Sequence, residues 1–183
     1  MTKALFFDID GTLVSFETHA IPASTIEALT IAHEKGIKIF IATGRPKAII
    51  NNLADIQDRG LIDGYITMNG AYCFVGDEVI YKSAIPAGEV RALAKVCEQK
   101  GYPCIFVGEH TISVCQPNKL VHDIFYDFLH VDEIPVKTFE EAVQEEIFQM
   151  TPFVTVEEET EIQPQIPNCE SGRWFPAFAD ITA

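Results

Sequence analysis

The feature that most constrains the fold is a pair of short apolar runs, residues 4–7 and 37–42, separated by an amphipathic segment. Neither run alternates apolar with polar residues, which is typical of strands buried on both faces of a parallel sheet. Between the two runs, residues 23–35 carry apolar side chains at helical spacing, after Pro22 and before Gly36. This order of elements predicts a β-α-β unit.

The doubly wound pattern continues along the chain as far as residue 84. A second helix is expected to start at Pro46 and to run past Leu53, and a third strand is expected at residues 65–68. Residues 71–82 then resemble a β-hairpin that turns at Gly76-Asp77. The predicted fold class is therefore α/β, with a partial Rossmann-like parallel-sheet core.

A proline and a glycine between Ile85 and Gly88 indicate a domain boundary, after which helices alternate with short strands. We expect a core domain at residues 1–84 and an inserted α+β domain at residues 85–183. Its expected apolar helix stripes are Val90, Leu93, Ala94 and Cys97, then Val121, Ile124, Phe125 and Phe128, and its expected strands are residues 105–107, 111–115, 147–150, 153–156 and 178–182.

The charge balance limits the partners of this chain. With 13 basic and 27 acidic residues, the net charge of −14 would repel nucleic acid and an anionic membrane surface. We expect neither as a partner. A small phosphorylated metabolite would also be repelled, so an enzyme acting on one would need a local positive centre, most simply a divalent cation. The sequence leaves the oligomeric state open.

The cysteines and the N-terminus indicate a cytoplasmic protein. The chain has five cysteines, an odd number, and they show no C-x-x-C spacing, which is typical of reduced thiols. The first apolar run is broken by Asp8 and Asp10, so it fits neither a signal peptide nor a membrane span.

Two acidic side chains come directly after the first predicted strand, in Phe7-Asp8-Ile9-Asp10-Gly11. Alternation along a strand would point Asp8 and Asp10 the same way, with Ile9 opposed. They lie at the carboxyl end of a parallel strand, where α/β sheets bind ligands. An isolated D-x-D is more often a solvated turn, but the residues that follow and a matching motif at the next strand end favour a site.

Such a pair predicts a hard cation and covalent chemistry. Two close carboxylates raise the pKa of one of them, and a bound magnesium ion would reverse this by stabilising the charged form. A carboxylate held opposite the leaving group could then attack phosphorus.

The matching motif is Thr43-Gly44-Arg45, at the end of the second predicted strand. There a hydroxyl and a glycine-freed backbone amide could bind phosphate at a helix start. Taken alone, Thr43-Gly44 is more often a helix N-cap. One β-α-β crossover, however, is the spacing that brings two strand ends side by side.

These residues resemble the first two motifs of the haloacid-dehalogenase-like phosphatase superfamily. The two-aspartate form is similar to its phosphohydrolases and phosphomutases rather than to its dehalogenases. The third strand end, Thr67-Met68-Asn69-Gly70-Ala71, with the hairpin and the α+β insert, resembles the Cof-type sugar phosphatases, which carry a mobile cap of type IIB. The resemblance runs through essentially the whole chain.

The resemblance implies a role for each residue of the motifs. Asp8 would be the nucleophile and a ligand of Mg²⁺, and Asp10 the general acid/base, with its backbone carbonyl also on the metal. The backbone amide of Ile9 would face the phosphate, together with Thr43 and Gly44. Further candidates for substrate contact are Arg45 and Asn69.

The same resemblance also implies a lysine and a Gly-Asp loop with further magnesium ligands, and neither is recognisable in the sequence. Gly76-Asp77 is already assigned to a hairpin turn, and Arg173 is the sole basic residue after Gly172. The first strand would then have an open apolar edge. We expect these residues to form the beginning of a longer enzyme or a truncated form of one, with negligible turnover by themselves.

Three functions stay open at this point. The first is a magnesium-dependent hydrolase of small sugar phosphates that works through an aspartyl phosphate. The second is a phosphomutase, which would use the same two aspartates but return the phosphoryl group to its substrate. The third is a non-catalytic module that binds phosphorylated metabolites or regulates another protein.

Overall fold

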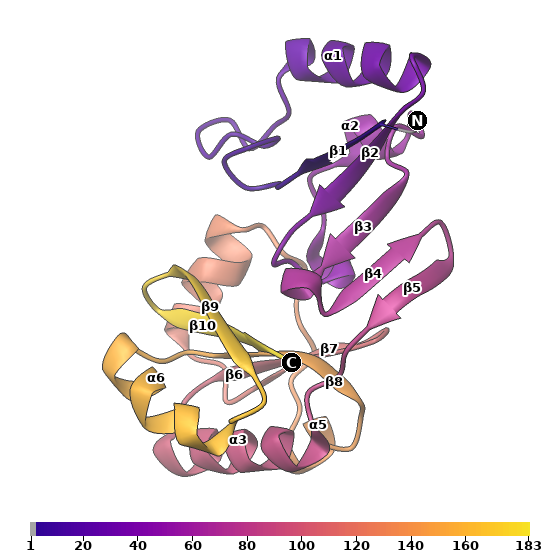
Figure 1. Ribbon diagram of the computed structural model, residues 1–183. Helices are drawn as coiled ribbons and strands as arrows, with labels where there is room; N and C mark the ends of the chain where they lie inside the picture. The colour runs from indigo at the N-terminus through magenta and orange to yellow at the C-terminus, as the bar shows by residue number, and fades with distance from the viewer. Residues whose placement is uncertain (1–2) are drawn as a thin grey trace. The chain divides into compact units, whose positions relative to one another are not determined.

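The computed structural model describes residues 3–183 and divides into two compact units (Figure 1). The first unit ends at Lys82 and the second spans Ser83–Ala183. The observed division therefore falls two residues before the boundary predicted after residue 84. Each unit contains a five-stranded sheet of its own.

The sheet of the first unit is mixed. Its elements are β1 (Lys3–Phe7), α1 (Ala23–Glu34), β2 (Ile37–Ala42), η1 (Lys47–Ile49), α2 (Ala54–Gln57), β3 (Gly64–Thr67), η2 (Met68–Gly70), β4 (Tyr72–Val75) and β5 (Glu78–Lys82). The strands lie in the order β1-β2-β3-β4-β5; β1, β2 and β3 are parallel, and β4 and β5 add antiparallel. The predicted β-α-β unit, the hairpin and the α/β fold class are confirmed.

The core of this unit lies on one face of its sheet. Leu29 of α1 packs there with Ile39 and Ile41 of β2. The prediction that both apolar runs are buried on two faces is wrong: β2 buries only Ile39 and Ile41. In β1, Phe6 is 58% and Leu5 40% exposed. For β1 the physical reason is that it forms the edge of the sheet, with no strand beyond it among residues 3–183. The predicted open apolar edge is thus confirmed.

The second predicted helix is also wrong. The chain forms only a 3₁₀ turn, η1, and a single α-helical turn, α2, because Ile50 between them has an extended backbone (φ −83°, ψ 96°). Ile49, Leu53 and Ile56 are nevertheless all buried. The helical spacing of these apolar residues is therefore satisfied by two short turns.

The second unit is an antiparallel sheet with helices. Its elements are α3 (Ala87–Lys100), β6 (Cys104–Gly108), β7 (Ile112–Cys115), α4 (Lys119–Val121), the π-helix η3 (His122–Phe128), α5 (Phe139–Ala142), β8 (Ile147–Pro152), α6 (Val156–Ile162), η4 (Gln163–Gln165), β9 (Glu170–Phe175) and β10 (Phe178–Thr182). The strand order is β7-β6-β8-β10-β9.

Side chains pack on both faces of this sheet. On one face, residues of α3, α5 and α6 form a single cluster with β6, β8 and β10, and the predicted α3 stripe is buried along its whole length. On the other face, Phe125 of η3 packs against Phe153 and Phe178, with ring centroids 5.9 Å from each. As a result, every residue of β6, β8 and β10 is buried.

Several sequence-based predictions fail in this unit. Phe128 was expected on the inner stripe but is 39% exposed, while Leu129 is buried, because a π-helix spaces its contacts at i+5 instead of i+4. The strands predicted at residues 147–150 and 153–156 are one strand, β8, followed by the N-terminus of α6. Strand β9 and helix α5 were not predicted.

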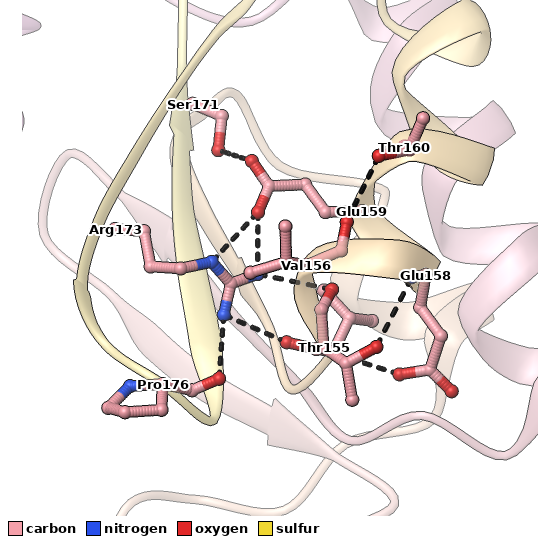
Figure 2. A network of polar contacts seen from close by, with 9 residues as sticks. Thr155, Val156, Glu158, Glu159, Thr160, Ser171, Arg173 and Pro176 are labelled. Carbon is pink, nitrogen blue, oxygen red and sulfur yellow. Dashed lines mark hydrogen bonds and ion pairs between the residues drawn. The ribbon is translucent and has the colours of Figure 1, made fainter.

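Figure 2 shows the contacts of Glu158 and Glu159, which belong to the acidic run at residues 157–161. Glu158 forms a capping box with Thr155 at the start of α6. Glu159 accepts hydrogen bonds from Arg173 Nε at 2.9 Å and from the Ser171 hydroxyl, both on β9. The Arg173 guanidinium also donates to the carbonyl of Pro176, at the turn of the β9–β10 hairpin (2.8 Å). This network attaches the hairpin to α6.

The cysteines are free thiols; Cys73 is half-buried and the other four are buried. Within residues 3–183, no helix has both the length and the apolar character that a membrane crossing requires.

Candidate active site

The chain turns sharply where β1 ends. Val14 N–H donates to the Ile9 carbonyl, and Gly11 N–H donates to the Val14 carbonyl, both at 2.9 Å. Gly11 has a φ of +76°, a conformation that residues with a side chain rarely adopt. Ile9 is fully buried in the core, whereas Asp8 is exposed and Asp10 is half-buried. The two acids thus lie opposite Ile9, but both follow the end of β1, and Asp10 pairs with Val14 in an isolated bridge.

The two carboxyl groups interact electrostatically. Although Asp8 is exposed, the protein around it removes part of its water, which raises the pKa of its carboxyl above the usual value, and the negative charge of Asp10 raises it further. A hydrogen bond from the Ile9 backbone amide and the positive charge of Arg45 offset part of this rise. In this structure the Ile9 amide therefore contacts the Asp8 carboxylate, the group that the resemblance makes the nucleophile.

Arg45 follows β2, and two of its three guanidinium nitrogens bind the Asp10 carboxylate. Nε donates to Oδ2 and Nη2 to Oδ1, each at 2.8 Å. The Arg45 side chain is only 7% exposed, against 22% for Asp10. In the register of the parallel pair, Phe7 lies beside Ile41. The two strand ends are therefore adjacent, and the charged groups that follow them meet.

The remaining candidate site residues are Thr43, Gly44 and Asn69. Thr43 is buried, and its hydroxyl oxygen accepts a hydrogen bond from the Arg45 amide at 3.1 Å. The backbone N–H of Asn69, which follows β3, donates to the Thr43 carbonyl at 3.3 Å. Its side-chain Oδ1 lies 2.9 Å from where a Cβ on Gly44 would stand. The close approach of Asn69 explains why residue 44 is a glycine.

The structure thus brings together the side chains that the sequence selected at the ends of β1, β2 and β3. It differs in two respects. No helix begins at Thr43-Gly44, because the chain continues into η1 and not into a regular helix. In addition, Arg45 binds Asp10 rather than projecting freely toward a substrate. The sequence does contain a signal for the pair of Arg45 and Asp10. Arg45 directly follows Thr43-Gly44, and this motif is separated from the two acids by one β-α-β crossover.

The acidic residues suit a magnesium ion. The Asp10 carboxylate is already paired with the Arg45 cation, which disfavours a second cation there, so the candidate ligands are the Asp8 carboxylate and the Asp10 backbone carbonyl. Both are hard oxygen donors, and Mg²⁺ usually binds to one or two carboxylates while water and substrate phosphate fill its other positions. The raised pKa of Asp8, caused by desolvation and by Asp10, is the imbalance that a cation would correct.

Comparisons with known proteins identify the family and the fold. A family model described as haloacid dehalogenase-like hydrolase matches residues 5–178. A solved HAD subclass IIB sugar phosphatase is 75% identical, with a TM-score of 0.96, and the match covers 100% of this chain and 70% of that one. A HAD phosphatase from Bacteroides thetaiotaomicron is 34% identical, with a TM-score of 0.83, over 100% of this chain and 67% of that one.

A relative is also found in Bacillus subtilis (strain 168). It carries the name "Putative phosphatase YkrA" and is 29% identical over 185 residues, which cover 98% of this chain and 68% of the relative.

Proposed function

Because the chain belongs to the haloacid dehalogenase-like hydrolase family, we propose that it carries the nucleophile and the acid/base of a magnesium-dependent phosphomonoester hydrolase. Asp8 is the nucleophile and Asp10 is the general acid/base. Thr43, Gly44 and the Ile9 amide bind the phosphate, and Asn69 contacts the substrate. The observation that carries the proposal is the turn that holds Asp8 and Asp10 at the end of β1, beside the Thr43-Gly44-Arg45 segment.

The chemistry proceeds in two steps. Asp8 Oδ attacks phosphorus and the bond to the leaving oxygen breaks, while Asp10 gives that oxygen a proton. Water then attacks the aspartyl phosphate, Asp10 takes a proton from the water, and the Asp8–phosphorus bond breaks to release phosphate. A bound magnesium ion supplies positive charge for the phosphate oxygens.

The substrate class is a small sugar phosphate or a related metabolite. Support comes from the 75% identical solved structure, which is a sugar phosphatase by its description. A reduced thiol set and the lack of a membrane-crossing helix in residues 3–183 are compatible with a cytoplasmic enzyme. We further propose that residues 85–183 act as a cap that selects the substrate.

The test uses beryllofluoride, BeF₃⁻, which binds to an aspartate in the place of a phosphoryl group. The chain is titrated with BeF₃⁻ in the presence of Mg²⁺, and the melting temperature is recorded. We expect an increase, because a ligand that binds only the folded state stabilises it. Asp8→Asn should abolish the increase, and Asp180→Asn, in the second unit, should keep it.

If BeF₃⁻ shifts the Asp8→Asn variant as much as the native chain, the nucleophile is assigned wrongly. The reaction type is measured separately with sugar phosphates and with release of free phosphate as the readout. Phosphate release supports a hydrolase, phosphoryl transfer without release a phosphomutase, and binding without either a metabolite-binding module.

A further inference from the structure

Arg45 is held rigidly on both sides of its side chain. Its guanidinium Nη1 donates to the Ile49 carbonyl at 3.1 Å and lies 3.4 Å from Asn51 Oδ1. Its backbone amide donates to the Thr43 hydroxyl, and its carbonyl accepts from the Met68 amide at 3.4 Å. The side chain is 7% exposed. A long side chain with so many fixed contacts has little rotational freedom, and it transmits that rigidity to the group it binds.

The group it binds is the Asp10 carboxylate. Two parallel N–H···O bonds of 2.8 Å fix the plane of a carboxylate as well as its position, which a single donor cannot do. Asp10 lies beyond the end of β1 and pairs with Val14 in an isolated bridge, so the regular geometry of a strand does not orient its side chain. Each carboxylate oxygen has two lone pairs, so both keep a free position for a proton from water or the leaving group.

The same bonds argue against a direct contact between Arg45 and the phosphate. The side of the guanidinium with Nε and Nη2 is occupied by Asp10, and Nη1 points to the loop carbonyl of Ile49. To reach a phosphate, Arg45 would have to give up a largely buried ion pair and leave the Asp10 charge without a partner.

We propose that Arg45 is a positioning residue: its bidentate contact orients the Asp10 carboxylate for proton transfer in the hydrolysis of the aspartyl phosphate. The inference rests on the proposed function. In that step water forms a bond to phosphorus and gives a proton to Asp10, while the phosphorus–oxygen bond to Asp8 breaks and its electron pair returns to the Asp8 carboxylate. The position of Asp10 relative to the water therefore governs this step.

The experiment compares two phosphate analogues with Mg²⁺ and the full chain. BeF₃⁻ on Asp8 resembles the aspartyl phosphate before attack, whereas AlF₄⁻ between Asp8 and an apical water resembles the transition state, in which the water contacts Asp10. Affinities are measured by thermal-shift titration. We expect Arg45→Met to weaken AlF₄⁻ binding about 10- to 100-fold, because misplacing a catalytic group by about 1 Å has an effect of this size. Binding of BeF₃⁻ should weaken less than binding of AlF₄⁻, and Arg45→Lys, which keeps the positive charge near Asp8, separates the loss of charge from the loss of orientation.

Three further variants make the test specific. Asp10→Asn should weaken AlF₄⁻ binding selectively, and Arg45→Met should add nothing in that background, because the two residues act as one unit. Arg45→Lys keeps the charge but loses the second parallel bond, so an intermediate loss is expected. Arg173→Met removes the corresponding ion pair of the second unit and should leave the ratio of the two affinities unchanged. Should Arg45→Met fail to fold, Arg45→Lys supplies the same comparison.

Each outcome decides whether Arg45 positions Asp10. Equal weakening of both analogues by Arg45→Met would make Arg45 a structural residue only and overturn the inference. So would a full effect of Arg45→Met in the Asp10→Asn background, or a native chain that binds BeF₃⁻ but not AlF₄⁻. If the native chain does not bind BeF₃⁻ at all, the proposed function itself fails, and the inference falls with it.

Discussion

The two sheets of this protein have five strands each, but they bury their apolar residues very differently. In the second unit, β6, β8 and β10 are buried along their whole length, with helices on one face and an aromatic cluster on the other. In the first unit, β1 is equally apolar in sequence, yet Phe6 is 58% exposed. The comparison teaches that an apolar strand sequence does not itself produce burial, because burial requires a neighbouring strand and a second layer.

The two units also use one interaction for different purposes. Each contains an arginine that binds a carboxylate in a largely buried ion pair: Arg45 with Asp10, and Arg173 with Glu159. In the second unit the pair attaches a hairpin to a helix (Figure 2). In the first unit it holds an acid that the proposed function uses. Both contacts pair a guanidinium with a carboxylate, but Arg45 donates to both oxygens of Asp10, whereas Arg173 donates twice to one oxygen of Glu159. The location of each pair determines what it does.

The largest expected effect tests the difference in burial. Phe106 in β6 is 1% exposed and Phe6 in β1 is 58% exposed, so Phe→Ala at the two positions forms a matched pair. Phe106→Ala should cost about 3–5 kcal/mol of unfolding free energy, from lost transfer energy and a cavity. Phe6→Ala should cost about 1 kcal/mol or less, mainly its stacking on Phe40. Urea unfolding followed by circular dichroism measures both, and similar costs would contradict the comparison.

The next effect tests the ion pair of the second unit. The side chains of Arg173 and Glu159 are 17% and 19% exposed, whereas those of Lys100 and Glu161 are 54% and 65% exposed. Arg173→Met should cost roughly 3 kcal/mol, because it leaves a largely buried carboxylate unpaired. Lys100→Met is the control, with an expected cost of about 1 kcal/mol or less. Trp174, the single tryptophan, reports the unfolding of this unit by fluorescence. Equal costs would show that the network in Figure 2 does not hold the hairpin.

A third prediction concerns pH and a buried acid of the second unit. Burial by itself would raise the pKa of Glu89, but hydrogen bonds from the Asn168 side chain, the Cys169 thiol and the Asn168 amide outweigh it and lower the pKa below its usual 4.5. Because the folded-state pKa is lowered, the stabilisation is present above pH 4.5 and is lost as pH falls through the lower folded value.

Glu89→Gln should therefore be less stable than the native chain at pH 7, and the difference should shrink below pH 4.5. Urea unfolding monitored by Trp174 fluorescence at several pH values measures it. A difference that does not change with pH would contradict the assignment to ionised Glu89.

The smallest expected effect compares two glycines. A Cβ on Gly44 would stand 2.9 Å from Asn69 Oδ1, whereas a Cβ on Gly88 in α3 would meet nothing within 4 Å. Gly44→Ala should cost about 0.5–1.5 kcal/mol, as Asn69 is forced from its rotamer. Gly88→Ala should instead stabilise the chain by about 0.4–1 kcal/mol through a less flexible unfolded state. The melting temperature should fall in Gly44→Ala and rise in Gly88→Ala. A rise in both variants would show that Asn69 does not constrain the Thr43-Gly44 segment.

The sequence was most informative where structure depends on nearby residues. The apolar spacing of α3 placed Val90, Leu93 and Cys97 on one buried stripe, and all are buried. The Gly76-Asp77 turn fixed the hairpin of β4 and β5. Periodicity alone could not separate a regular helix from the short turns η1 and α2, since both bury Ile49, Leu53 and Ile56. It also could not detect the π-helix that leaves Phe128 exposed.

By itself, then, the sequence determined the β-α-β unit, the hairpin of β4 and β5, and the presence of two acids directly after the first strand, because all three are properties of nearby residues. Only the tertiary structure decided that the side chains of Leu5 and Phe6 in β1 are exposed and that Arg45 binds Asp10. Arg45 and Asp10 are 35 positions apart, and their contact depends on the register of β1 beside β2 and on the turn after each strand. Contacts between distant residues are set by how the elements pack, which local patterns do not encode.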